Sequence, residues 1–466
     1  MYKLRSILIN VGMQTILQDI PKYLITLIQA LRSRLHDEAF LARHRVRPED
    51  FTRQRQLTFP VMMLFILQQT VKSLQRHLHE FLDELAQGAI FEPVTAGAVT
   101  HARAKLKPSA FVELNQQCVL PTVYGPEHPI QRWRGHRLLG LDSSLLRLPD
   151  SAELGQAFGW KEPANQHGAT GTRFPEARLS VVYDVLNRLG HQARVEPSTV
   201  GEVPLAIEQI QQLESWQPGD IALNDRGFSG YLYFAEVLRR GLHFIGRCST
   251  GSFLAAQELF RLNRANHSKV VWLFCPPDQK AECGRRGLPL KIKVRFVSVR
   301  LPTGELEVLA TSLLEETDYP TEEFLGVYHR RWGHETFHLM LKGRLELENF
   351  SGRTVEAVQQ DVQAAVLLAN LESVLSEPAQ AALDEQRRAQ TQPRKVNRAN
   401  AYHALKDQVL ELLSGEVPVE QVLEKLMKLL AGSPVAVRPE RPVPKRRRPS
   451  FHRSYHFQRR VKKIVF

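Results

Sequence analysis

The sequence predicts an α/β protein whose mixed core lies between helical N-terminal and C-terminal regions. Residues 1–130, and those beyond about 320, carry apolar side chains at helical spacing. Between these regions, short apolar runs bounded by turn residues surround one amphipathic helical segment, which is typical of strands packed against helices. With 466 residues, 43% of them hydrophobic, the chain is long enough to fill the cores of about two to four domains.

The N-terminal region, residues 1–130, is predicted to be helical. The run "FPVMMLFILQQTVKSLQRHLHEFLDELA" has helical periodicity, and Gly88 is its expected end. The run "TAGAVTHARAKLKPSAFVELNQQ" predicts two short helices broken at Lys107 and Pro108. The first of these is rich in Lys, Arg and His, so a small DNA-binding unit and a plain helical bundle both fit this region.

Residues 131–249 have the pattern of strands and one helix. The run "RLLGLDSSLLRL" suits a buried strand that leads into a hairpin, and "EARLSVVYDVLNRLGHQARVEPS" suits two strands around a turn at 187–190. "VPLAIEQIQQLESW" predicts an amphipathic helix with a broad apolar face. "GDIALNDRGF" predicts a strand that ends in a turn. Three strands, a helix and a fourth strand indicate α/β architecture.

The rest of the chain divides into four segments. Residues 250–312 are expected to be a β-rich insertion, because "HSKVVWLFC", "PLKIKVRFVSVRL" and "ELEVLATSL" favour strands. Residues 313–380 return to helical periodicity. Residues 381–432 are expected to contain a last helical segment, reached through the polar linker "EPAQAALDEQRRAQTQPRK". Residues 433–466 form a basic tail.

Most of the positive charge lies in that tail. The whole chain has 62 Lys or Arg against 49 Asp or Glu, a net charge of +13. Residues 433–466 contain eleven Lys or Arg and one acid, so they alone carry +10. A flexible basic arm favours a polyanion, most plausibly nucleic acid, through phosphate contacts and counterion release. A solubilising tail is the alternative.

The cysteines and the N-terminal apolar stretches indicate a cytoplasmic protein without a membrane partner. The four cysteines have no CxxC spacing, which argues against a disulfide framework or a zinc ribbon and fits a reducing compartment. Apolar stretches such as "YLITLIQAL" are interrupted by charged residues well short of a membrane span. No signal peptide or transmembrane segment is expected.

Two aspartates follow apolar runs that are predicted to be strands. Asp142 ends "LLGLD", and Asp225 ends "IALND". Strand ends at the rim of a sheet are where α/β proteins tend to bind ligands. The alternative for each residue is an aspartate that caps a turn.

A glutamate, Glu335, lies in the run "YHRRWGHETFHLMLK" at residues 328–342. On one continuous helix, with about 100° per residue, four polar side chains fall within an arc of about 60°, namely Tyr328, Arg331, Glu335 and Lys342. Phe337, Met340 and Leu341 could bury the opposite side, while Trp332 flanks the polar stripe. A catalytic face and an exposed stripe with weak intrahelical ion pairs are both compatible with this pattern.

Two strand-end aspartates and a helical glutamate predict an oxygen-rich, negatively charged pocket. Hard divalent cations such as Mg²⁺ prefer carboxylate oxygens, waters and substrate phosphates. Two ions about 4 Å apart can activate an attacking oxygen and stabilise a leaving one in phosphodiester displacement. His334 and His338, four residues apart, could instead bind zinc, but no convincing further ligands accompany them.

These residues resemble those of the transposases of insertion-sequence family four. Tyr328, Arg331, Glu335 and Lys342 match the family signature Tyr-x2-Arg-x3-Glu-x6-Lys. "LLGLDSSL" resembles the block around the family's first catalytic aspartate, and "IALNDRGF" resembles the block with the second. The resemblance covers roughly residues 90–380. It implies an RNase H-like core, at 131–249 and 313–380, interrupted by a β-rich insertion.

The resemblance also implies a role for each matched residue. The catalytic, metal-binding triad would be Asp142, Asp225 and Glu335. Side chains that position DNA ends or phosphates would be Tyr328, Arg331, Lys342 and, beside them, Trp332. Two positions depart from the family: Ser143 replaces a usual Gly, and His334 stands where Ile is common. Neither departure removes a ligand, although Ser143 could alter the turn beside the metal site.

The implied function is cut-and-paste transposition of an insertion sequence, with Mg²⁺ as cofactor and Mn²⁺ as a substitute. Water activated at the metal site would cleave a strand at the element's end. The freed 3′-hydroxyl would then attack the opposite strand, giving a hairpin, or target DNA. The implied partners are double-stranded DNA, as terminal inverted repeats and target, and a second copy of the chain. The implied location is the bacterial cytoplasm, at the nucleoid.

Two other functions fit the same residues. One is a catalytically inactive relative that only binds DNA ends, against which the presence of all three acids counts. The other is an RNase H-like nuclease without strand transfer. Products in which DNA strands are joined as well as cut would distinguish a transposase from a nuclease.

Overall fold

A computed structural model of the chain describes residues 20–437 except 54, 69–71, 88–91, 163, 166–167, 170–172 and 387–392. The chain divides into two compact units, each built from separate stretches of sequence. The helical unit comprises Met1–Pro129, Arg147–Pro175 and Leu341–Phe466. The sheet unit comprises Ile130–Leu146 and Glu176–Met340. The expected domain boundaries at 130, 249, 312, 380 and 432 stay predictions.

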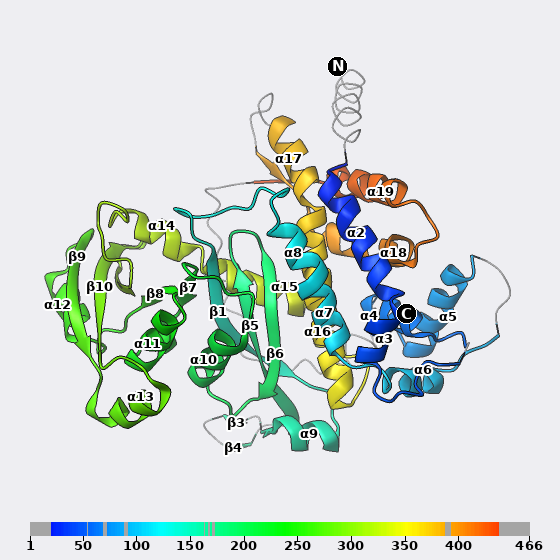
Figure 1. Ribbon diagram of the computed structural model, residues 1–466, viewed down its shortest axis with the longest axis horizontal. Coiled ribbons are helices and arrows are strands. Elements are labelled where there is room, and N and C mark those ends of the chain that lie inside the picture. Colours follow the sequence, from blue (N-terminus) through cyan, green and yellow to red (C-terminus); the bar gives the residue numbers. More distant parts are fainter. Residues whose placement is uncertain are drawn as a thin grey trace. The chain divides into compact units, whose positions relative to one another are not determined.

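One nine-stranded mixed sheet organises the α/β part of the chain (Figure 1). Its order is β2-β5-β1-β7-β8-β11-β10-β9, with β6 paired to β5. The strands are β1 (Leu138–Arg147), β2 (Trp160–Lys161), β5 (Phe174–Asp184), β6 (Leu189–Pro197), β7 (Ile221–Asn224), β8 (His243–Arg247), β9 (His267–Phe274), β10 (Lys291–Arg300) and β11 (Leu306–Thr311). β1, β7 and β8 run parallel, whereas β8, β11, β10 and β9 pair antiparallel.

The β-rich segment predicted at 250–312 contributes β9, β10 and β11 to this sheet. β11 pairs with β8 from Leu309 to Thr311, so the segment extends the sheet at the edge formed by β8. The segment also contains two helices, α12 (Leu254–Leu262) and α13 (Lys280–Arg286). The strands that precede the segment and those within it therefore form one continuous surface.

Helices pack on both faces of the sheet. One face is buried with α10 (Glu202–Gln212), α11 (Tyr231–Arg239), α12 and α13, and its core includes Phe234 stacked on Phe244 with ring centroids 4.0 Å apart. The other face is buried with α14 (Glu323–His329) through Phe324 and Val327. Successive strand side chains alternate between these two cores because the period of a strand is two.

The helical unit is built around a long buried helix, α16 (Val355–Leu375). The helices and turns of this unit are α2 (Lys22–Leu35), α3 (Glu38–His44), α4 (Phe59–Leu67), α5 (Leu74–Leu85), α6 (Ala96–Arg103), α7 (Ser109–Leu114), η1 (Asn115–Val119), α8 (Leu120–Val123), α9 (Ala152–Phe158), α16, α17 (Glu377–Gln386), α18 (Arg398–Ser414) and α19 (Val419–Gly432). Arg103 of α6 is buried and donates to Asp361 of α16 at 2.6 Å. Arg103, a basic residue of the candidate DNA-binding segment, therefore forms a buried ion pair in the core of this unit.

The structure differs from the sequence prediction in three elements. Residues 138–147 form one strand, β1, rather than a strand and a hairpin, because β5 pairs along it. Residues 377–386, predicted as linker, form helix α17. The predicted single helix of 328–342 is two helices, α14 and α15 (Trp332–Gly343). Between these two helices the backbone bonds span three residues, as from the Arg331 amide to the Tyr328 carbonyl.

Other predictions fall outside the described residues or concern the membrane. The expected helix end at Gly88 and residues 438–466 of the basic tail lie outside the described part of the chain. Within the described part, no helix is both long and apolar enough to cross a membrane.

A buried ion pair joins the starts of the two strands that lead to the aspartates. Arg137 precedes β1 and Asp220 precedes β7, and both are almost fully buried. The Arg137 Nε atom donates to Asp220 Oδ1 at 2.8 Å, and Nη2 donates to Oδ2 at 2.5 Å. Nη2 also donates to the Ser215 carbonyl at 2.7 Å. Such a fork fixes both distance and angle between the two strands.

Replacing Asp220 by Ala is expected to lower the free energy of unfolding by about 3–5 kcal/mol, because it leaves a buried guanidinium unpaired. Urea unfolding followed by circular dichroism measures the loss. Replacing Arg137 by Met as well should recover part of it, since no unpaired charge then remains. Arg134→Ala is the control, because the Arg134–Glu323 pair is solvent-exposed and its loss should change unfolding little. Equal effects of Asp220→Ala and Arg134→Ala would contradict the role given to the buried pair.

Candidate functional site

Asp142 and Asp225 lie at the same level of two neighbouring parallel strands. In the β1–β7 pairing, Gly140 lies opposite Leu223. Continuing this register by two residues sets Asp142 beside Asp225, and neighbouring strands are about 4.8 Å apart. Asp225 follows β7 in an extended conformation, before the 3₁₀ turn η2 (Arg226–Phe228). The register therefore sets these two positions side by side where β7 ends, while β1 continues past this point.

The two faces of β1 present different chemistry beside Asp142. Gly140 and Asp142 share one face, and Ser143 points to the other, because side chains alternate along a strand. A Cβ atom built on Gly140 would lie 2.8 Å from Nδ1 of His334, so α15 crosses this strand at close range. Glycine at position 140 thus lets the helix that carries Glu335 approach the strand that carries Asp142.

Asp142 is held in a setting that disfavours its charged form. Burial raises the pKa of Asp142 to about 6, and the negative charges of Glu202 and Glu335 act in the same direction. The backbone N–H of Ser143 donates to Asp142 Oδ1 at 2.8 Å and, with the positive charge of Arg331, opposes the rise. A cation placed at this carboxylate would relieve the unfavourable charge.

A polar network behind Asp142 was not foreseen from the sequence. The Ser143 hydroxyl donates to Glu202 Oε1 at 2.5 Å. Nη1 of Arg178 donates to the same Glu202 oxygen and to the Ser143 hydroxyl oxygen, each at 2.7 Å. Glu202 stands in the first turn of α10, and Arg178 projects from β5. Only the departure from the family at Ser143 pointed to this network, because its partners lie 35 and 59 residues away.

Glu335 is paired with Arg331 rather than standing free. Nη2 of Arg331 donates to Glu335 Oε1 at 2.8 Å. The Arg331 guanidinium carbon lies 5.7 Å from the ring centre of Tyr328 and 5.4 Å from that of Trp332. Burial works against the charge of Arg331, but Tyr328, Glu335 and Asp225 more than offset it and raise its pKa. The arginine is therefore a fixed positive charge between the acids.

The expected DNA-binding residues differ in their accessibility. Tyr328 is buried, and its hydroxyl has no hydrogen-bond partner among the described residues. Burial raises the pKa of Tyr328 above its usual range. Trp332 is 52% exposed. Lys342 belongs to the helical unit, where its Nζ lies 4.0 Å from Glu348 Oε1.

Two of the three histidines of this segment, His334 and His338, are packed, whereas His329 is exposed. The rings of His334 and His338 stack with centroids 4.9 Å apart, and His334 also stacks on Tyr183 of β5. His334 is fully buried, and burial lowers its pKa well below the usual range, with His338 and Arg331 acting the same way. Within the described residues, no three His, Cys, Asp or Glu side chains are grouped to hold a metal ion. The zinc alternative gains no support.

The three acids supply the ligand types for a divalent cation without forming one cluster. Carboxylate oxygens suit hard cations such as Mg²⁺ and Mn²⁺. Asp142 and Asp225 share a sheet edge, and the charge of Glu335 acts on Asp142. The Glu335 carboxylate is nevertheless bonded to Arg331, and no three-ligand group is present among the described residues. The donor chemistry fits a cation, and Glu335 would have to turn from Arg331 to complete the set.

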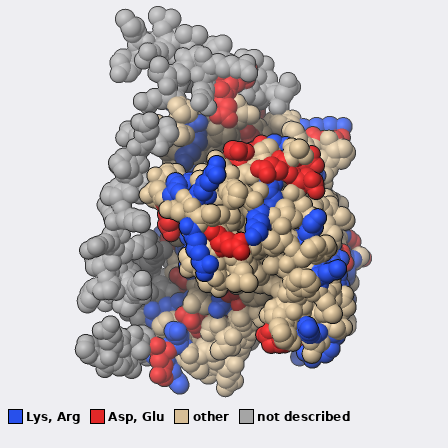
Figure 2. Space-filling model, turned by 90° about the vertical axis from the view of Figure 1, so that its left-hand side faces the viewer, with Lys and Arg blue, Asp and Glu red and all other residues tan. Residues whose placement is uncertain are grey.

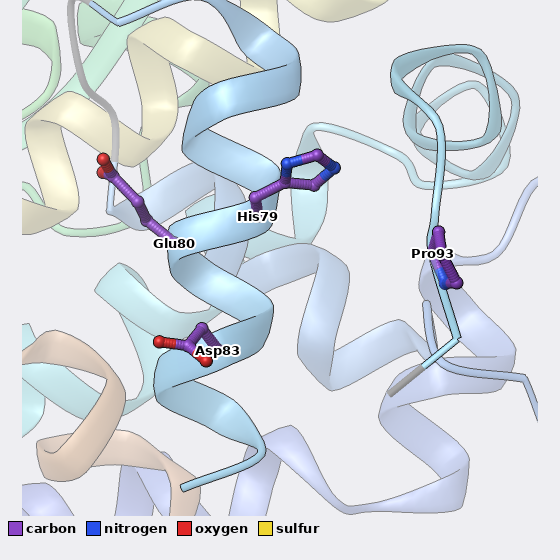
Figure 3. Close-up of a pocket in the computed structure, with 4 residues that line it drawn as sticks. All are labelled: His79, Glu80, Asp83 and Pro93. Carbon is purple, nitrogen blue, oxygen red and sulfur yellow. The ribbon is translucent and has the colours of Figure 1, made fainter. Parts of the chain in front are cut away.

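A pocket in the helical unit offers less chemistry. It is a shallow, open pocket of about 470 Å³, lined by His79, Glu80, Asp83 and Pro93. His79 projects from α5 towards Pro93 in Figure 3. The Glu80 carboxylate is already paired with Lys72 and Arg76. We assign no catalytic role to this pocket.

The raised pKa of Asp142 makes the stability of the cation-free protein depend on pH. The folded pKa of about 6 exceeds the usual value near 3.9, so folding favours the protonated acid. The stabilising contribution is complete below about pH 4 and is lost as the pH rises through 6. Asp142→Asn should therefore stabilise the protein in EDTA at pH 8, by about 3 kcal/mol at most. At pH 4 the gain should vanish.

Urea unfolding at both pH values measures this difference. The control is Glu305→Gln, which removes an exposed acid of the same unit and should leave the pH dependence unchanged. A stability gain from Asp142→Asn that is the same at pH 4 and pH 8 would show that burial does not raise the pKa.

The close approach of α15 to β1 also has a measurable consequence. Gly140→Ala should lower the free energy of unfolding by about 1–3 kcal/mol, because the new Cβ atom meets the His334 ring. Adding His334→Ala should cost less than the sum of the two single changes, since the obstacle is removed. Gly251→Ala is the control, as nothing lies within 4 Å of its Cβ position. Strict additivity in urea unfolding would contradict the contact.

Comparison with known proteins identifies the family. The sequence profile of the family described as "Transposase DDE domain" matches residues 133–371, just over half of the chain. No curated protein matches. Among solved structures, the cryo-EM structure of the piggyBac transposase synaptic complex with hairpin DNA is similar, with a TM-score of 0.42 and 13% identity over 89% of this chain and 86% of that one. The matched stretch contains Asp142, Asp225 and Glu335, and the chain belongs to the transposase DDE domain family.

Proposed function

We propose that the chain is a DNA transposase of insertion-sequence family four that cuts and joins DNA by a metal-dependent, cut-and-paste reaction. The observation that carries the proposal is the parallel register of β1 and β7, which when continued sets Asp142 beside Asp225, together with the charge of Glu335 acting on Asp142. Family membership supports the reaction class. The RNase H-like core is proposed from the strand order β6-β5-β1-β7-β8 with a helix before and after β7.

Each residue has a proposed task at the reacting phosphodiester. Asp142, Asp225 and Glu335 would hold Mg²⁺ or Mn²⁺, which supplies charge neutralisation and activation of the attacking oxygen when bound. Arg331 lies next to Glu335 and could hold a phosphate oxygen once the carboxylate turns away. Trp332 is exposed beside it and could stack on a base or sugar. The ring of buried Tyr328, which lies against the Arg331 guanidinium, would hold that side chain in position.

The proposed reaction has two phosphoryl-transfer steps. Water attacks the phosphodiester at the end of the element, so the phosphorus–oxygen bond to the 3′ side breaks and a 3′-hydroxyl is released. That hydroxyl then attacks a phosphodiester of the opposite strand or of target DNA, and a new strand junction forms as another breaks. The partners proposed are terminal inverted repeats, target DNA and a second copy of the chain.

Alanine at Asp142, Asp225 or Glu335 is expected to abolish strand cleavage while binding to the element's ends is largely retained. Each acid is needed to hold the cation, whereas DNA affinity comes mainly from basic side chains. Cleavage of DNA that carries the inverted repeats flanking the gene, in Mg²⁺, measures activity, and a gel shift measures binding. Asp278→Ala, which removes an exposed acid, is the control.

Three results would change the proposal. Full cleavage by all three alanine variants would show that the site is assigned wrongly. Cuts without joined strands from the unaltered protein would favour a nuclease. Binding to the ends without any cleavage would favour an inactive end-binding relative.

A further inference from the structure

A second concentration of positive charge lies inside the sheet unit. Residues 251–300 contain ten Lys or Arg and only three Asp or Glu, a net charge of +7. The tail and this stretch together therefore carry more net positive charge than the chain as a whole, so the rest of the chain is net negative. Unlike most of the tail, the stretch is fully described and forms α12, β9, α13 and β10. Its charges have fixed positions relative to one another.

The outermost strands of the sheet present aromatic and basic side chains on one face. In the β9–β10 pairing, Trp272 lies opposite Lys293 and Phe274 lies opposite Lys291. These four side chains project to the same side, because residues opposite each other in a ladder share a face. Trp272 is 51% exposed and Phe274 is 69% exposed, and Val270 continues the row. We call these five residues the Trp272 face.

The opposite side of the same strands explains why the Trp272 face is not needed for folding. Ile292 and Val294 of β10 are buried in the core that includes α11 and α12, and Val271 and Leu273 of β9 pack against it. The alternation along both strands is therefore already used to bury one side. Large aromatic side chains on the solvated side add nothing to that core, and solvent would favour smaller or polar residues there.

The two lysines of the Trp272 face are not engaged by acids. Nζ of Lys291 lies 5.0 Å from the Trp272 ring centre, and Nζ of Lys293 lies 6.0 Å from it. Neither lysine forms an ion pair with any described residue, whereas Lys269 on the same strand as Trp272 is bonded to Glu258. Figure 2, which views the side where Figure 1 labels β9 and α12, shows Lys and Arg side chains on this face, interspersed with Asp and Glu. The ammonium groups are free to move from the ring to an anion.

We propose that the Trp272 face binds single-stranded DNA, with Trp272 and Phe274 stacking on unpaired bases and Lys291 and Lys293 contacting phosphates. Side chains two apart on a strand are about 6.6 Å apart, which lets two aromatic rings meet separate bases. Stacking tolerates any base, and lysines track the backbone. A duplex offers phosphates but keeps its bases stacked inside, so it would leave both aromatic rings unused.

A protein partner fits this surface less well. The centres of protein interfaces are depleted in lysine, and covering Trp272 with another protein would also bury the two ammonium groups beside it. A net charge of +7 over the segment complements a polyanion. The proposal rests on the proposed function for its ligand, since a transposase that opens DNA ends exposes unpaired bases.

The test measures binding of the full-length protein to a fluorescent 12-nucleotide oligothymidine and to a 12-base-pair duplex by anisotropy. Trp272→Ala should weaken oligothymidine binding about tenfold, within the range for one lost base stack. Duplex binding should change less than twofold. Trp272→Phe should retain most of the affinity, because a ring remains. Leu254→Ala, which removes a 77% exposed side chain of α12, should alter neither affinity.

The lysines are tested through salt dependence. Lys293→Ala should lower the slope of log affinity against log salt by about 0.7 for oligothymidine, the value for one phosphate contact to a single strand. Quenching of tryptophan fluorescence by oligothymidine should be smaller in Trp272→Phe than in the unaltered protein.

Three outcomes would overturn the proposal. They are unchanged oligothymidine affinity in Trp272→Ala, an equal loss for duplex and single strand, and a changed oligomeric state of Trp272→Ala in light scattering, which would make the face a protein contact. The anisotropy assay measures binding alone and requires no cleavage by the protein. The binding result therefore stays readable if the proposed cleavage activity is not found.

Discussion

The parallel pairing of β1 with β7 is the constraint on which the candidate site depends. Its register sets Asp142 beside Asp225, although 82 residues separate them in the sequence. The buried Arg137–Asp220 pair lies at the starts of the same two strands and fixes their separation. A slip of one residue would send Asp142 to the α10 face, where Ser143 now meets Glu202. Register is thus as important to the site as the acids themselves.

Most elements could be predicted because the periodicity of their side chains is a property of the local sequence. The prediction failed where pairing with residues far away in the sequence determines the structure. The strands at 189–197 and 221–224 and the helix at 202–212 were expected from alternation and amphipathicity. The end of β1 was placed too early, because pairing with β5 carries the strand past the point where β7 stops. The break between α14 and α15 was missed because a single tight turn changes the angular positions of the polar residues only slightly. Their pattern therefore still resembles that of one continuous helix.

The acids of the site were visible in the sequence, but their present partners were not. Asp142, Asp225 and Glu335 follow recognisable patterns, whereas the Arg331–Glu335 pair and the Arg178–Ser143–Glu202 network exist only in three dimensions. In both arrangements an arginine balances the negative charge of a partly buried glutamate. Arg331 neutralises Glu335 directly, while Asp142 has only a backbone N–H and a distant arginine to oppose its burial. Asp142 is consequently the acid that has most to gain from a cation.

The distribution of positive charge separates two tasks that a DNA transposase must perform. Around the three acids, Arg331 is the base that acts on both Asp142 and Glu335, and it is buried and fixed. The solvated lysines Lys291 and Lys293 lie instead on the outermost strands, where β10 and β9 end the sheet. A densely basic site would hold DNA tightly but would also neutralise the carboxylates that a cation needs. On the proposed function, lysines on an extension of the same sheet would attract DNA without adding further positive charge beside the acids proposed to bind metal.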